Sequence, residues 1–106
     1  MDVYIFDAVR TPRGKGRPDG SLANVSPVRL VEQLVRALEH RTGREAVHAA
    51  GHFTLGCVTQ VGAQGGHIAL ASRIRAGLPD ALPCLTINNF CVSGLSAVAD
   101  AARRVA

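Results

Sequence analysis

The sequence has few aromatic residues: it contains no tryptophan, one tyrosine and three phenylalanines among 106 residues. A buried core must therefore be built from the aliphatic residues of a chain that is 47% hydrophobic. No apolar run approaches the length of a membrane span, and no basic region followed by an apolar stretch opens the sequence. We therefore expect one folded domain over residues 1–106 that makes no membrane contact.

Cysteine is also scarce. The three cysteines are an odd number, and none has the CxxC or Cys/His spacing of a ligand set. This pattern indicates neither a disulfide framework nor a zinc site. We expect a reduced, cytoplasmic setting and no bound metal.

Positive charge is concentrated near the start of the chain. The formal net charge is +4, and Arg10, Arg13, Lys15 and Arg17 fall within eight residues. No aromatic residues are interleaved to stack on bases, and no recognition helix accompanies the cluster. We interpret it as a solvated basic loop and expect no nucleic-acid partner.

Strand and helix patterns alternate along the chain. Apolar runs rich in β-forming residues predict strands at residues 3–6, 53–58 and 84–87. Three helices are predicted: one opened by Ser26 as N-cap, one over residues 67–76, and one starting near Cys91. The order β-α-β-α-β-α predicts an α/β fold with a mainly parallel sheet covered by helices.

Within the helices, apolar residues mark the predicted buried faces. The first helix carries one stripe, and Thr42–Gly43 are predicted to end it. The second helix is expected to align Ala71, Ile74 and Leu78, and the third, rich in small residues, is expected to be buried on several sides. Three strands make a poor sheet of this type, and the sequence stops inside an apparent helix, so we expect part of a larger domain.

Cys91 is the strongest candidate for chemistry. It lies between a strand and a helix, where unpaired backbone N–H groups and the helix dipole favour the thiolate. A free cysteine more often simply packs, but the small neighbours Ser93 and Gly94 leave room for a substrate. Cys57 and Cys84 are expected to pack in or beside their strands.

The four histidines, His40, His48, His52 and His67, are candidate bases, although none has the spacing of a metal pair. We expect ordinary surface roles for all four, with His40 and His48 facing solvent. His67 opens the second helix and could lie near Cys91. The glycine-rich residues 14–16 and 62–66 lack the spacing of phosphate-binding loops.

Several segments, taken together, resemble the thiolases (acetyl-CoA C-acyltransferases). Residues 8–14 and 20–22 resemble the family's opening motif, residues 55–62 its Gly-x-Val-x-Gln-x-Gly segment, and residues 88–97 the segment around the acyl-accepting cysteine. Residues 77–79 also match the family, before the third predicted strand. All these matches follow the family order and together cover the whole chain. Residues 65–68 depart from the family's Asn-Pro-x-Arg-like segment.

The resemblance implies that Cys91 carries the acyl group and that its backbone N–H helps to hold the acyl oxyanion. It implies coenzyme A thioesters as substrates, no further cofactor and no metal, and a homo-oligomer or a completing chain as partner. The family's His activator and second Cys acid/base belong to later motifs that these 106 residues do not contain. A non-catalytic module and a ketosynthase-type relative stay open as alternatives.

Overall fold

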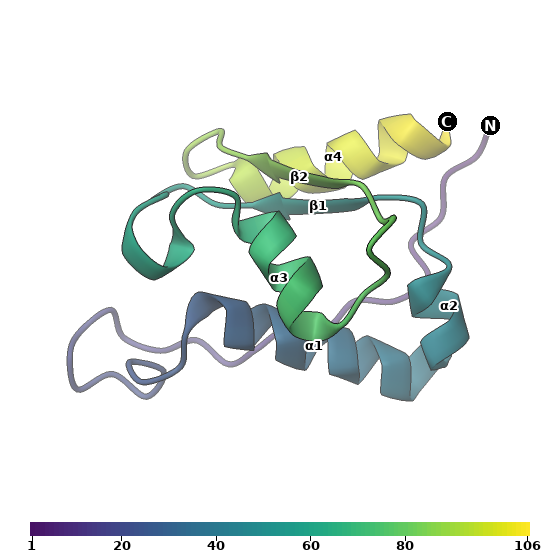
Figure 1. Cartoon of the computed structure of the whole chain (residues 1–106). Coiled ribbons are helices and arrows are strands. Elements are labelled where there is room, and N and C mark those ends of the chain that lie inside the picture. Colours follow the sequence, from purple (N-terminus) through teal and green to yellow (C-terminus); the bar gives the residue numbers. More distant parts are fainter.

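The computed structural model describes residues 1–106 as four α-helices, one 3-10 helix and two strands (Figure 1). In chain order these are α1 (Pro27–Thr42), α2 (Arg44–His48), β1 (Phe53–Gly56), η1 (Gly62–Gln64), α3 (Ile68–Ala76), β2 (Cys84–Ile87) and α4 (Ser93–Val105). No helix is both long and apolar enough to cross a membrane.

The two strands form a small parallel sheet with helices on both faces. Phe53 pairs with Cys84 and Gly56 with Ile87, so the carboxyl ends of both strands lie at one edge. Helix α4 covers one face of the sheet, α3 covers the other, and α1 packs on the far side of α3 (Figure 1). The predicted α/β class with a parallel sheet covered by helices is confirmed.

The strand predicted at residues 3–6 is wrong. These residues are irregular, and the side chains of Ile5 and Phe6 are exposed. A strand forms only where a neighbour takes up its backbone hydrogen bonds, and β1 pairs with β2 alone. The sheet therefore has two strands, and its β1 edge is free.

Helix α1 begins and ends as its sequence predicts. The Ser26 hydroxyl accepts a hydrogen bond from the Arg29 N–H at 3.3 Å, Pro27 occupies the first turn, and Gly43 ends the helix at φ 92°. Its apolar stripe faces inward, and Val35 is buried. Val35 joins residues that follow α1 in a compact core of four: Val35, Ala76, Leu78 and Leu82.

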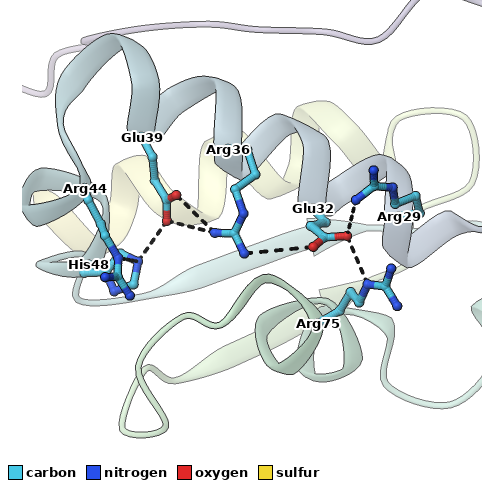
Figure 2. Close-up of polar contacts among 7 residues, drawn as sticks. All are labelled: Arg29, Glu32, Arg36, Glu39, Arg44, His48 and Arg75. Atoms are coloured by element: carbon cyan, nitrogen blue, oxygen red, sulfur yellow. Dashed lines mark hydrogen bonds and ion pairs between the residues drawn. The ribbon is translucent and has the colours of Figure 1, made fainter.

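Helix α2 is not predicted by the sequence, because five residues are too short to show a helical period. Two carboxylates of α1 contact side chains of the neighbouring helices α2 and α3 (Figure 2). Glu39 contacts His48 of α2 at 2.9 Å, and Glu32 contacts Arg75 of α3 at 3.0 Å. These contacts fix α1 against both neighbouring helices.

The buried face of α3 differs from the predicted one. Ile68, Ser72 and Ala76 point inward at four-residue intervals, whereas Ile74 is exposed. Small side chains at 69, 72 and 76 let α3 fit between α1 and the sheet. His67 caps this helix, as its position in the sequence predicts, and Gly77 ends it in the left-handed conformation.

Helix α4 is buried on one side only, which corrects the expectation of burial on several sides. Ser93 and Ala97 are buried, and Asp100 on the same side accepts a hydrogen bond from the Thr54 hydroxyl of β1 at 3.1 Å. The opposite side exposes Leu95, Val98 and Val105. One helix face thus packs on the sheet, and the other is apolar and exposed.

Candidate active site

Cys91 lies in the connection between β2 and α4, two residues before α4 begins, and its side chain is exposed. The strand-to-helix position predicted from the sequence is confirmed. The connection leaves the sheet at the edge where β1 and β2 both end. In parallel sheets this edge is where ligands usually bind.

The turn that carries Cys91 has an unusual backbone conformation. Phe90, the preceding residue, has φ 49°, the one positive φ of a non-glycine residue in the chain. Bulky side chains rarely adopt this left-handed region. The Phe90 N–H donates to the Asn88 side-chain oxygen at 3.0 Å, which helps to hold the residue in place.

Ser93 closes the turn from the buried side. Its side chain is almost fully buried, with 3% of the residue exposed. Its hydroxyl accepts a hydrogen bond from the Asn89 N–H at 2.9 Å and donates one to the Phe90 carbonyl at 2.6 Å. From its small size alone, Ser93 is expected only to leave room for a substrate. A serine at the start of a helix is the signal that could indicate these hydrogen bonds, because its hydroxyl can bond to backbone groups three or four residues earlier.

The start of α4 leaves backbone donors free. Val92, the N-cap residue, makes no side-chain hydrogen bond to the helix. A hydrogen bond joins the Ser96 N–H to the Val92 carbonyl, but the N–H groups of Gly94 and Leu95 have no partner. Such groups attract negative charge, so the geometry suits a thiolate or an oxyanion beside Cys91.

The turn packs against the sheet through a close backbone contact between Gly56 and Ser93. A Cβ atom at Gly56 would lie 2.6 Å from the Ser93 carbonyl oxygen, so any side chain there would clash with the start of α4. Glycine at the end of β1 therefore allows α4 to begin directly against the strand. The sequence shows this glycine, but nothing in it indicates the contact.

None of the four histidines hydrogen-bonds to Cys91. His67 Nδ1 accepts from the Leu70 N–H and lies 2.8 Å from the Thr86 hydroxyl of β2, so this ring joins α3 to the sheet. His40 is exposed as predicted, but His48 is not: its side chain is 19% exposed because it contacts Glu39 across the α1–α2 junction. The buried Nε2 of His52 has no hydrogen-bond partner.

The two other cysteines and the basic loop lie as the sequence predicts. Cys84 begins β2, and Cys57 follows β1, where its N–H donates to the Ile87 carbonyl at 2.9 Å. Both side chains are partly buried beside their strands. The basic side chains at positions 10, 13, 15 and 17 are all exposed, as expected of a solvated loop.

A large, mostly apolar cavity of the fold does not include Cys91. It has a volume of about 860 Å³, and most of its lining is apolar. Its walls come from residues 5–7, α1, α2 and β1, with Leu78 and Leu82 at the core side. No cysteine lines this cavity.

The family model of the thiolase N-terminal domain matches residues 3–106, which is nearly the whole chain. The chain belongs to the thiolase family. Among its thiolase relatives, the beta-ketoadipyl-CoA thiolase of Pseudomonas knackmussii is 41% identical over 105 residues, which are 99% of this chain and 26% of that protein. The 3-ketoacyl-CoA thiolase of Alcanivorax borkumensis is 36% identical over 104 residues, covering 98% of this chain and 26% of that protein.

The thiolase fold is also found by structural comparison. The crystal structure of the Bacillus anthracis acetyl-CoA acetyltransferase matches with a TM-score of 0.71 and 31% sequence identity, over 81% of this chain and 21% of that one. The thiolase resemblance predicted from the sequence motifs is therefore confirmed. The chain spans about a quarter of the length of the curated thiolases it matches.

Proposed function

We propose that Cys91 is the acyl-accepting residue of a thiolase-type acyltransferase that uses coenzyme A thioesters. The observation that carries this proposal is an exposed thiol on a strained turn, two residues before a helix whose first N–H groups, at Gly94 and Leu95, are free, in a chain of the thiolase family. A thiol at a helix N-terminus is more readily deprotonated, and the thiolate is the nucleophile.

In the degradative direction, the Cys91 thiolate attacks the keto carbon of a 3-ketoacyl-CoA, and the carbonyl electron pair moves to oxygen. Backbone N–H groups of the turn, that of Cys91 among them, stabilise this oxyanion. Its collapse breaks the bond to the adjacent α carbon, and acetyl-CoA leaves after its carbanion takes up a proton. The CoA thiolate then attacks the acyl-Cys91 thioester, which releases acyl-CoA and the Cys91 thiolate.

In the synthetic direction, Cys91 is acetylated by acetyl-CoA and passes the acetyl group to the carbanion of a second acetyl-CoA. Both directions need a base for the Cys91 thiol. Degradation also needs an acid that protonates the carbanion, and synthesis needs a base that removes the α proton of acetyl-CoA to form it. No histidine of this chain hydrogen-bonds to Cys91. We therefore expect a completing segment or partner chain to supply both groups, and the 106-residue chain alone to be inactive in turnover.

The test is Cys91→Ala in the protein that contains this chain, with Cys84→Ala as the control. Incubation with acetyl-CoA should leave an acetyl group on Cys91, detected by mass spectrometry of the peptide. Cys91→Ala should abolish both the adduct and 3-ketoacyl-CoA cleavage, while Cys84→Ala keeps both. Cleavage that survives Cys91→Ala would contradict the proposal.

A non-catalytic, partner-binding module is the second candidate, favoured by the lack of a base beside Cys91. Robust turnover by the purified 106-residue chain would exclude it. A ketosynthase-type relative would accept acyl groups from a carrier protein, so the rates of transfer from CoA and from acyl-carrier protein separate that alternative. The thiolase-like opening at residues 10–12 favours CoA.

A further inference from the structure

One buried hydroxyl, that of Ser93, hydrogen-bonds to the backbone of both residues that precede Cys91. Ser93 Oγ accepts from the Asn89 N–H at 2.9 Å and donates to the Phe90 carbonyl at 2.6 Å. The Ser93 N–H also donates to the Phe90 carbonyl, at 3.1 Å. Asn89 and Phe90 are thus fixed from the C-terminal side of Cys91, by the first residue of α4.

The hydroxyl holds a conformation that the sequence does not favour. Phe90 has φ 49°, although a phenylalanine side chain strongly disfavours a positive φ. Such a conformation persists only where the surroundings determine it. Three contacts meet this need at Phe90: the Asn88 oxygen on its N–H, and the Ser93 hydroxyl and the Ser93 N–H on its carbonyl.

Ser72 shows that burial of a serine does not by itself produce such contacts. It is fully buried on α3, as Ser93 is nearly so on α4, yet its hydroxyl has no hydrogen-bond partner. Ser72 therefore fills space, whereas Ser93 satisfies one backbone donor and one backbone acceptor. Ser72 is therefore a matched control for Ser93: both serines are buried, but only the Ser93 hydroxyl is hydrogen-bonded to the backbone.

We propose that Ser93 is a positioning residue for Cys91: its hydroxyl keeps Phe90 left-handed, and this places the thiol beside the free N–H groups of α4. The functional part of this inference rests on the proposed role of Cys91. Without the hydroxyl, the Asn89 N–H loses its link to α4 and the Phe90 carbonyl keeps only the hydrogen bond from the Ser93 N–H. The turn then relaxes, and the thiol shifts relative to the start of α4.

The experiment measures the pH profile of Cys91 alkylation by iodoacetamide, resolved from Cys84 by mass spectrometry, so it does not depend on acyl transfer. Ser93→Ala should lower the alkylation rate of Cys91 at neutral pH by about two- to fivefold. Ser72→Ala should leave the Cys91 profile unchanged. A Ser93→Ala profile equal to that of the unmodified protein would overturn the proposal, as would an equal change at Cys91 and Cys84.

Two further variants separate positioning from general stability. Phe90→Gly removes the cost of the positive φ, so in this background Ser93→Ala should change the Cys91 profile much less. Ser93→Thr keeps the hydroxyl and should stay close to the unmodified profile, which gives a second comparison if Ser93→Ala does not fold. Full sensitivity to Ser93→Ala in the Phe90→Gly background, or a Ser93→Thr profile like that of alanine, would overturn the inference.

The outcomes also distinguish this inference from the proposed function. If Cys91 is never acetylated but Ser93→Ala still shifts its alkylation profile, the positioning role stands and the thiolase role of Cys91 falls. If Cys91 is acetylated and Ser93→Ala leaves the alkylation profile unchanged, the thiolase role of Cys91 stands and the positioning role of Ser93 falls.

Discussion

At the scale of single residues, two small side chains decide where the candidate nucleophile lies. Gly56 lets the backbone of β1 meet the backbone of α4 without a side chain between them. Ser93 supplies the buried hydroxyl that links α4 back to the turn. The turn that carries the exposed Cys91 thiol is therefore held by contacts on its buried side.

Gly56→Ala should destabilise the fold by about 1–3 kcal/mol, because the new methyl group would overlap the Ser93 carbonyl. Urea denaturation gives the free energy of unfolding. Gly51→Ala is the matched control, since a Cβ there meets nothing within 4 Å. Equal stabilities of the two variants would show that β1 and α4 do not meet this closely.

At the scale of secondary-structure elements, local signals predicted α1 and long-range contacts decided the rest. Ser26, Pro27 and Gly43 mark the ends of α1 within the sequence itself. Residues 3–6 read as a strand because they are apolar, but strand formation depends on a neighbour that their own sequence does not reveal. The inward face of α3 was likewise misread, because small residues such as Ser72 and Ala76 face the core while Ile74 does not.

The same distinction applies to the candidate site. The position of Cys91 before a helix was predictable from the apolar run and the small residues on either side of it. The left-handed Phe90 was not, because nothing in a phenylalanine predicts a positive φ. The role of His48 was also hidden, since Glu39 reaches it only after α2 folds back against α1.

Glu32 provides the pH-dependent link between elements. Hydrogen bonds from Arg29 and Arg75 hold its pKa below the ordinary value of 4.5. A carboxylate with a lowered pKa in the folded state stabilises the fold above its ordinary pKa, and this contribution is lost as the pH falls through the lowered value. Acid should therefore loosen the contact of α1 with α3.

Glu32→Gln should lower stability at neutral pH, and the difference from the unmodified protein should shrink as the pH falls below the carboxyl range. Denaturation at a series of pH values measures this difference. Glu45→Gln is the control, because Glu45 is exposed and forms no ion pair. A constant difference at all pH values would contradict the assigned role of Glu32.

At the scale of the whole molecule, little of the chain is buried. Only 9 of 106 residues are buried, so the stability of the fold rests on a small core. Large apolar side chains are exposed in several places, among them residues 3–6 and the outer face of α4. Contiguous exposed apolar surface promotes association.

The chain should self-associate as its concentration rises, and Leu95→Lys with Val98→Lys should weaken the association. Both side chains are exposed, at 70% and 55%, so the lysines should not disturb the core. Sedimentation velocity measures the oligomer distribution. Gln33→Lys is the control, because it adds positive charge on the exposed side of α1. If it weakens self-association as much as the α4 variant does, the effect comes from charge and not from the apolar face.

The parallel pairing of β1 and β2 also sets the order of events during folding. Phe53 pairs with Cys84, 31 positions later, whereas α1 and its cap form from neighbours within a few residues. Closing so long a segment makes sheet pairing slow relative to helix formation. The Cys91 turn follows β2 and rests on β1 at Gly56, so during refolding its thiol should acquire its native reactivity last.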